Sequence, residues 1–138
     1  MAHILIIDDD EATRYSLSRM VSRMSHTATC AATLEEGVAK ASAGGIDVVF
    51  LDVRMPDGNG IEMLPTFRQA PSSPEIIIIT GYGDPEGAEL ALKSGAWDYI
   101  EKGSSLKQMT LPLLRALQYR AERDSRAPVR SVISLKQE

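Results

Sequence analysis

The sequence of 138 residues has a single cysteine, Cys30, so no disulfide can form within the chain. It has no run of about twenty apolar residues, which argues against a membrane-spanning helix. The 15 Lys and Arg are outnumbered by 19 Asp and Glu, and a net charge of −4 argues against a domain that binds nucleic acid directly. No basic segment or cleavage site precedes the first apolar run, so we expect a cytoplasmic protein without a membrane anchor.

Five short apolar runs alternate with stretches of helical periodicity, and the chain is long enough for one domain with a core. Several runs are apolar at successive positions and rich in branched side chains, which is typical of strands covered on both faces of a parallel sheet. The predicted strands are His3–Ile7, Thr27–Ala31, Asp47–Leu51, Ile76–Ile79 and Tyr99–Ile100. We therefore expect an α/β domain with right-handed crossovers and helices on both faces of a doubly wound sheet.

Three of the intervening helices carry residues that mark a helix end or a distortion. Asp10 is the expected N-cap of the first, and Pro65 should distort the third early in its course. The fourth has Asp84 as its expected N-cap, Pro85 at its first position and Gly95 as a stop.

The last helix is predicted from Ser105 to about Arg123, with a kink at Pro112 because proline removes a backbone donor. Its basic residues are expected to form a solvated face; they are Arg115, Arg120 and Arg123. The tail, residues 126–138, has no strong periodicity and is predicted to be a linker.

Polar side chains follow the predicted strands at their carboxyl ends, where open parallel sheets bind ligands. They are Asp8, Asp9 and Asp10 after the first strand, Asp52 after the third, Thr80 after the fourth, and Glu101 and Lys102 after the fifth. Adjacent carboxylates repel, and a bound Mg²⁺ would remove that repulsion while also holding phosphate oxygens. A carboxylate beside Mg²⁺ can act as a nucleophile toward a phosphoryl group, which a hydroxyl and an ammonium can help to bind.

Four segments, "IIDDDEATR", "VVFLDVRMPDGNG", "IIIITGYGD" and "GAWDYIEK", together resemble the receiver domain of bacterial two-component response regulators. The resemblance covers roughly residues 3 to 121, and the combination is far more specific than any one segment. It implies a flavodoxin-like fold whose five strands have the order 2-1-3-4-5. It also implies that the domain, residues 1–121, catalyses only its own phosphorylation and dephosphorylation and is not a turnover enzyme.

The resemblance assigns a role to each matching residue. Asp52 would be the phosphoacceptor, with Thr80 and Lys102 completing the catalytic set. Mg²⁺, or Mn²⁺ in its place, would be held by Asp9, Asp52 and the backbone carbonyl of Arg54, and by Asp8 mainly through a coordinated water. The backbone N–H groups of Met55 and Gly81 would touch phosphate, Thr80 would be the switch hydroxyl, and Tyr99 would follow it.

The segment from residue 83 to residue 120 is most similar to receivers of enhancer-binding, sigma-factor-dependent transcription activators of the nitrogen-regulation class. This implies a sensor histidine kinase as phosphoryl donor and an output through helix 4, strand 5 and helix 5. It also implies an AAA+ ATPase effector domain after the linker, residues 122–138. Leucines of the last helix could form the seam of a homodimer; they are Leu106, Leu113, Leu114 and Leu117.

Receivers usually carry Lys-Pro after the fifth strand, whereas this sequence has Lys102-Gly103. We expect a trans bond there and a looser loop, with phosphorylation retained and the phosphate lifetime or the switching response changed. A degenerate receiver that binds partners without phosphorylation is therefore an alternative.

Two other classes fit less well. An aspartate-nucleophile phosphatase would have its nucleophile on the first strand and a cap domain, and a flavin-binding electron carrier would need a phosphate-cradling loop where the three aspartates stand. Simpler interpretations of single residues also exist. They are a turn aspartate at Asp52, a strand end at Thr80, a solvated loop lysine at Lys102 and edge packing at Tyr99.

Overall fold

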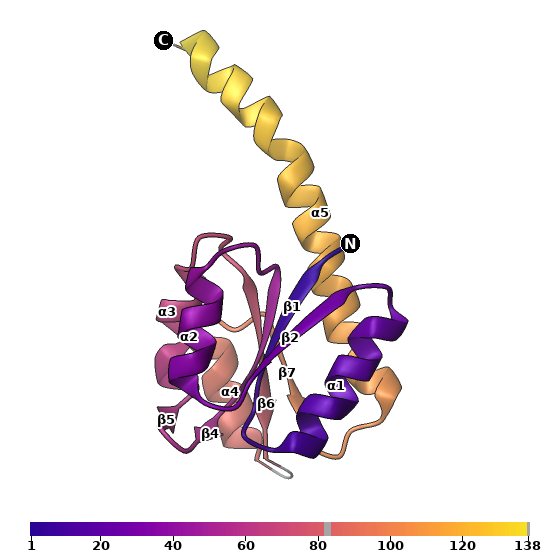
Figure 1. Cartoon of the computed structure of the whole chain (residues 1–138). Helices are drawn as coiled ribbons and strands as arrows, with labels where there is room; N and C mark the ends of the chain where they lie inside the picture. The colour runs from indigo at the N-terminus through magenta and orange to yellow at the C-terminus, as the bar shows by residue number, and fades with distance from the viewer. Residues whose placement is uncertain (82–83, 138) are drawn as a thin grey trace.

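The apolar runs of the sequence form a five-stranded parallel sheet (Figure 1). A computed structural model describes the backbone of residues 1–81 and 84–137 and the side chains of residues 1–81 and 84–125. The strands are β1 (His3–Ile7), β2 (Thr27–Ala31), β3 (Val48–Asp52), β6 (Glu75–Thr80) and β7 (Asp98–Glu101). Their order, β2-β1-β3-β6-β7, confirms the predicted order 2-1-3-4-5. β3 begins one residue later than predicted and includes Asp52, which leaves Asp47 before the strand.

Helices cover both faces of the sheet, as Figure 1 shows. They are α1 (Glu11–Arg23), α2 (Leu34–Ser42), α3 (Leu64–Arg68), α4 (Pro85–Lys93) and α5 (Leu106–Gln137). Side chains of β1 alternate between two hydrophobic clusters, with Ile4 and Ile6 packing with α1 and α5, and Leu5 and Ile7 packing with α2, α3 and α4. β1 lies between β2 and β3, so the residues at its carboxyl end are held by the centre of the fold.

The predicted helix ends are confirmed at three places. The carboxylate of Asp10 accepts hydrogen bonds from the N–H of Ala12 and the hydroxyl of Thr13, so Asp10 caps α1. Asp84 caps α4 by accepting from the N–H of Gly87 at 3.0 Å. Gly95 follows α4 with a φ of +102°, the left-handed conformation that ends many helices.

The region after β3 is more irregular than the sequence indicates. A two-stranded hairpin, β4 (Arg54–Met55) and β5 (Gly58–Asn59), precedes a 3₁₀ turn over Ile61–Met63. The predicted distortion near Pro65 is confirmed, because regular α-helix covers only the short α3. The hairpin was not predicted, since two strands of two residues each leave no periodicity in the sequence.

α5 corrects the prediction for the end of the chain. The helix contains Pro112 and continues to Gln137, so the predicted end at about Arg123 is wrong. Good helix formers such as Arg126, Ala127 and Arg130 follow the predicted end, and their propensity favours continuation of the helix beyond Arg123. In Figure 1 the later part of α5 projects away from the sheet at the amino ends of the strands. Within the described part of the chain, no helix combines the length and hydropathy needed for a membrane crossing.

Arg120 also corrects a prediction, because it does not belong to a solvated face. Its residue surface is only 5% exposed, and its guanidinium donates to the carbonyl oxygens of Ser73 at 2.8 Å and Ser72 at 3.1 Å. It also lies 3.4 Å from Oδ1 of Asp47. Arg120 therefore ties α5 to the loops that precede β3 and β6.

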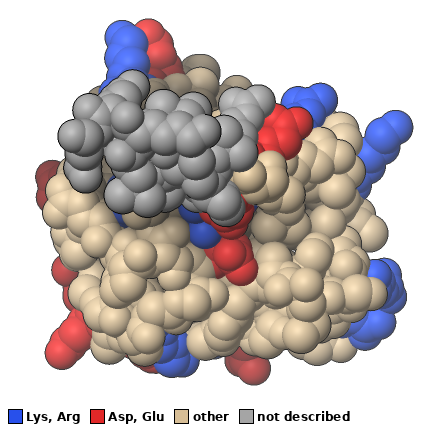
Figure 2. Space-filling model, turned by 90° about the horizontal axis from the view of Figure 1, so that it is seen from above, with Lys and Arg blue, Asp and Glu red and all other residues tan. Residues whose placement is uncertain are grey.

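Figure 2 views the molecule from the end at which α5 projects and shows basic and acidic side chains interspersed around the edge of this face. Arg115, by contrast with Arg120, is exposed as predicted, and Arg123 is half-buried beside Glu75 at 3.7 Å.

Candidate functional site

Three carboxylates meet at the carboxyl edge of the sheet. Asp8 and Asp9 follow β1, and Asp52 ends β3, which pairs with β1 so that Ile7 lies opposite Leu51. One carboxylate oxygen from each of the three aspartates lies within 4.8 Å of the others. Asp8 and Asp52 are buried and Asp9 is exposed, so the cluster opens toward solvent on one side.

The ammonium group of Lys102 completes this cluster. Its Nζ atom lies 3.2 Å from Oδ2 of Asp52 and 3.5 Å from Oδ1 of Asp8. The backbone N–H of Lys102 donates to the carbonyl oxygen of Thr80 at 3.0 Å, which fixes the start of the turn beside β6. The peptide bond between Lys102 and Gly103 is trans, as predicted, because the described residues contain no cis bond.

Burial and mutual repulsion shift the acidity of the two buried carboxyl groups. Burial, followed by the negative charge of Asp8, raises the pKa of Asp52 to about 6, although Lys102 opposes the shift. Burial also raises the pKa of Asp8, against the opposing effect of the N–H of Asp10 and the charge of Lys102. Burial lowers the pKa of Lys102, but Asp52 and Asp8 outweigh it, so that the net direction is upward. The charge of Lys102 therefore does not fully offset the burial and repulsion of the carboxylates, and an additional cation would stabilise the cluster.

The donor set suits a small divalent cation. Oδ1 of Asp8 accepts the N–H of Asp10 at 2.9 Å, whereas Oδ2 of Asp8 is buried and has no hydrogen-bond partner among the described residues. An unpartnered buried carboxylate oxygen is costly unless a cation or water satisfies it. Because hard oxygen donors are the preferred ligands of Mg²⁺, the residues present fit that ion.

Two further residues hold the aspartates in place and were missed by the sequence reasoning. A Cβ atom on Gly60 would overlap the carbonyl oxygen of Asp52, so only glycine allows the chain to pass there. The guanidinium of Arg14, in the first turns of α1, donates to the carbonyl oxygen of Asp8 at 2.8 Å. The only available signals were the glycines of "DGNG" and the basic residue that closes "DDDEATR".

Thr80 and Tyr99 lie on adjacent strands beside the cluster. Thr80 is the last residue of β6, is fully buried, and its hydroxyl donates to the carbonyl oxygen of Ile100 at 3.3 Å. β6 also pairs with β3, with Asp52 opposite Ile79, so Thr80 ends next to the phosphoacceptor candidate. Tyr99 is half-buried on β7 and packs against the core on the side of α2, α3 and α4.

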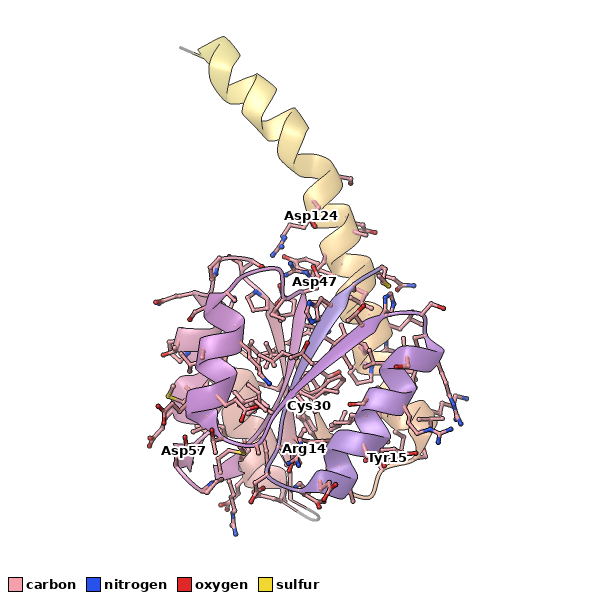
Figure 3. All side chains as sticks on the ribbon, in the orientation of Figure 1. Arg14, Tyr15, Cys30, Asp47, Asp57 and Asp124 are labelled. Atoms are coloured by element: carbon pink, nitrogen blue, oxygen red, sulfur yellow. The ribbon has the colours of Figure 1, made fainter. Side chains whose placement is uncertain are left out.

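The remaining predicted site residues lie in loops at the same edge. Arg54 and Met55 form β4; the side chain of Arg54 points to solvent and that of Met55 is buried in the core. Gly81 directly follows β6 and is exposed. In Figure 3, Asp57 and Arg14 lie at this edge, whereas Asp47 and Asp124 lie at the opposite end of the sheet.

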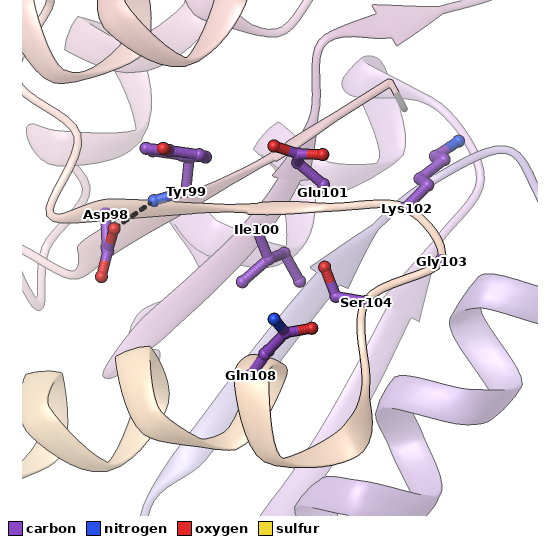
Figure 4. Close-up of a pocket in the computed structure, with 8 residues that line it drawn as sticks. All are labelled: Asp98, Tyr99, Ile100, Glu101, Lys102, Gly103, Ser104 and Gln108. Atoms are coloured by element: carbon purple, nitrogen blue, oxygen red, sulfur yellow. Dashed lines mark hydrogen bonds between the residues drawn. The ribbon is translucent and has the colours of Figure 1, made fainter. Parts of the chain in front are cut away.

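A pocket of about 400 Å³ runs along the outer edge of β7. Figure 4 shows Tyr99 and Glu101 on one side of this strand, and Ile100 and Gln108 on the other. Of its lining residues only Lys102 also belongs to the carboxylate cluster. The pocket therefore adjoins the site and does not contain the three aspartates.

Comparison with known proteins shows the family of this chain. The family described as "Response regulator receiver domain" matches residues 4–113. The photosynthetic apparatus regulatory protein RegA of Rhodovulum sulfidophilum is 34% identical over 111 residues, which are 80% of this chain and 61% of RegA. The regulatory protein AtoC of Escherichia coli is 34% identical over 115 residues, which are 83% of this chain and 25% of AtoC.

A solved structure of a receiver domain also resembles this chain. The beryllofluoride-activated receiver domain dimer of NtrC4 has a TM-score of 0.79 and 31% identity, over 86% of this chain and 98% of that one. This chain thus matches a receiver along almost the whole of that domain, while it spans less than two thirds of RegA and AtoC. The chain belongs to the response regulator receiver domain family.

Proposed function

We propose that this domain accepts a phosphoryl group on Asp52 from a sensor histidine kinase in a Mg²⁺-dependent reaction. The observation that carries the proposal is the position of Asp52, which lies 3.2 Å from the ammonium of Lys102 and within one carboxylate cluster with Asp8 and Asp9. Such a site supplies a nucleophile, a cation-binding group and a fixed positive charge at one sheet edge.

Asp8, Asp9, Asp52 and the carbonyl of Arg54 would hold Mg²⁺. When bound, the ion supplies positive charge that neutralises the carboxylates and the phosphoryl oxygens. A carboxylate oxygen of Asp52 forms the new bond to phosphorus while the bond from phosphorus to the donor's histidine nitrogen breaks, and the imidazole leaves with the electron pair. Lys102 would donate a hydrogen bond to a phosphoryl oxygen, and the backbone N–H groups of Met55 and Gly81 would do the same.

The phosphorylated state would differ from the free state at Thr80. Its hydroxyl now donates to the carbonyl of Ile100 at 3.3 Å, a long hydrogen bond that a phosphoryl oxygen can replace. Withdrawal of that hydroxyl from β7 opens space beside Tyr99, which can then turn inward. This would change the surface formed by α4, β7 and α5 by shifting a population that exists before phosphorylation.

The output is proposed to be regulation of transcription. AtoC and RegA carry the word "regulatory" in their names and are longer than this chain, which supports an effector domain beyond residues 122–138. The dimer of the NtrC4 receiver supports a homodimer, here through exposed apolar residues of α5 such as Leu111 and Leu114. Leu113, which was expected in the seam, is fully buried in the core and is not available for it. The domain is proposed to turn over only its own phosphate, and a cytoplasmic location stays a prediction.

The decisive experiment is the intact mass of the protein after incubation with acetyl phosphate and Mg²⁺. A single phosphoryl adduct is expected, absent from the Asp52→Asn variant and absent when a chelator removes Mg²⁺. The Thr80→Val variant keeps the shape of the side chain and should still be phosphorylated. It should lose the change in dimerisation that we expect phosphorylation to cause in the original protein. An unmodified mass at every Mg²⁺ concentration would instead support an interaction module that works without phosphorylation.

A further inference from the structure

Asp57 links the loop after the phosphoacceptor candidate to a helix that is distant in the sequence. One oxygen of its carboxylate accepts the N–H of Leu34 at 2.9 Å, and the other accepts the N–H of Glu35 at 3.0 Å. These are donors of the first turn of α2, which have no partner within the helix itself. The carboxylate therefore fastens the loop to the positive end of the α2 dipole.

The loop fastened in this way is the hairpin of β4 and β5. Arg54 pairs with Asn59 and Met55 with Gly58, so Asp57 lies in the two-residue turn at the tip. At its base the N–H of Gly60 donates to the carbonyl of Val53 at 2.8 Å. The hairpin is thus held at its base beside Asp52 and at its tip on α2.

Packing reinforces the same contact. A Cβ atom on Gly58 would lie 3.1 Å from Cδ1 of Leu34, so the hairpin backbone packs closely against the side chain of Leu34. The backbone N–H of the same residue is the one that Asp57 binds. Met55 and Leu34 also belong to one hydrophobic cluster. The bonds from Leu34 and Glu35 lower the pKa of Asp57, so its carboxylate is charged at neutral pH.

We propose that Asp57 is a positioning residue for the metal site, which holds the hairpin so that the carbonyl of Arg54 can bind Mg²⁺. This inference rests on the proposed function, because that function supplies the role of the Arg54 carbonyl. Asp57 lies three residues from Arg54 and acts through the hairpin, not by touching the ion.

α2 offers a matched control for this proposal. Thr33 is also an N-cap of α2, since its hydroxyl oxygen accepts the N–H of Glu36 at 3.1 Å. Removal of either cap weakens the start of the same helix, but only Asp57 connects that helix to the hairpin. Any effect specific to the metal site therefore separates the two residues.

The experiment titrates MgCl₂ alone into the full chain and its variants and follows backbone amide shifts at Asp9 and Asp52 by NMR. We expect Asp57→Ala to weaken Mg²⁺ binding about tenfold, the size typical of residues that orient a metal ligand. Thr33→Ala should leave the Mg²⁺ affinity within about twofold of the original. It should lower the stability of the protein about as much as Asp57→Ala does. Asp57→Asn keeps one acceptor oxygen and should fall between the two.

Equal Mg²⁺ affinities for Asp57→Ala and Thr33→Ala would overturn the positioning role and leave the proposed function intact. Absence of Mg²⁺ binding by the unmodified chain would overturn both. A variant that fails to fold is recognised by its amide spectrum, and in that case Asp57→Asn carries the test against Thr33→Ala.

Discussion

The Nζ atom of Lys102 lies 3.2 Å from Oδ2 of Asp52 and is carried there by a turn whose third residue has a φ of +87°. That residue is Gly103. The N–H of Ser104 donates to the carbonyl oxygen of Glu101 at 3.1 Å, which closes the turn over four residues. A positive φ at the third position marks a type II turn, in which glycine or asparagine is favoured.

Gly103→Pro should therefore disrupt the turn, because proline fixes φ near −65° and cannot adopt the observed value. We expect phosphorylation by acetyl phosphate to slow and the phosphate lifetime to change, since the Lys102 ammonium would leave its place between Asp52 and Asp8. Gly103→Asn tolerates the left-handed conformation and should stay close to the original protein. The rates come from intact mass over time, and equal rates for the proline and asparagine variants would contradict this account.

The pH dependence of stability should report the buried Asp52. Its pKa rises from 3.8 in the unfolded chain to about 6 in the folded, metal-free protein. A raised pKa means that the folded state holds its proton more tightly, so the stability associated with this group is present below pH 3.8 and is lost as the pH rises through 6. Asp52→Asn removes this loss, and it should raise the free energy of unfolding by about 1–2 kcal/mol more at about pH 7.5 than at about pH 4.5.

Urea denaturation in the presence of a chelator measures this difference. Added Mg²⁺ should stabilise the original protein and not the asparagine variant at the higher pH, because the ion binds the charged folded state. An effect of Asp52→Asn that is the same at both pH values would show that Asp52 is not protonated in the folded state at the lower pH.

Arg120 should be a major contributor to stability. Replacement by methionine keeps the apolar stem but leaves the carbonyl of Ser72 and Oδ1 of Asp47 without the donor that Arg120 supplies, and it removes the shorter of two hydrogen bonds to the carbonyl of Ser73. We expect a loss of about 2–3 kcal/mol in the free energy of unfolding, as is typical when one partner of a buried polar network is removed. Arg115→Met, on the exposed side of the same helix, should change it by no more than about 0.5 kcal/mol. Equal losses in the two variants would contradict an anchoring role for Arg120.

Self-association should depend on the exposed leucines of α5. Leu111 is 38% and Leu114 is 41% exposed, and a spacing of three residues places them on one side of the helix. Leu111→Glu with Leu114→Glu should weaken dimerisation of the phosphorylated protein about tenfold or more, because it puts charge into an apolar contact. Sedimentation with and without acetyl phosphate tests this, and an unchanged dimer would place the interface elsewhere.

The sheet and the polar residues at its edge could be predicted because both depend on local patterns. Runs such as Ile4–Ile7 show two-sided burial directly, and a residue that follows a parallel strand must lie at its carboxyl edge. Asp8, Asp52 and Lys102 were therefore brought together correctly, and Asp10 was separated from them as a helix cap.

The contacts that were missed join residues far apart in the sequence. Arg120 was expected to be solvated because a basic residue on a helix is usually exposed, and its partners Asp47 and Ser72 are more than forty positions away. Asp57 reaches back 23 positions to Leu34, and no periodicity records such a contact. The extent of α5 was missed for a different reason, because the lack of strong periodicity in residues 126–138 was interpreted as a linker.

The anchoring of α5 at Arg120 gives the helix the properties of a lever with its fulcrum at the amino ends of the strands. The 17 positions from Ala121 to Gln137 make an arm of about 25 Å at the usual helical rise. A rotation of about 10° at Arg120 would move Gln137 by about 4 Å, which is more than the donor–acceptor distance of a hydrogen bond. A small rotation of α5 about Arg120 would thus become a displacement of several ångströms at Gln137, the last residue of the helix.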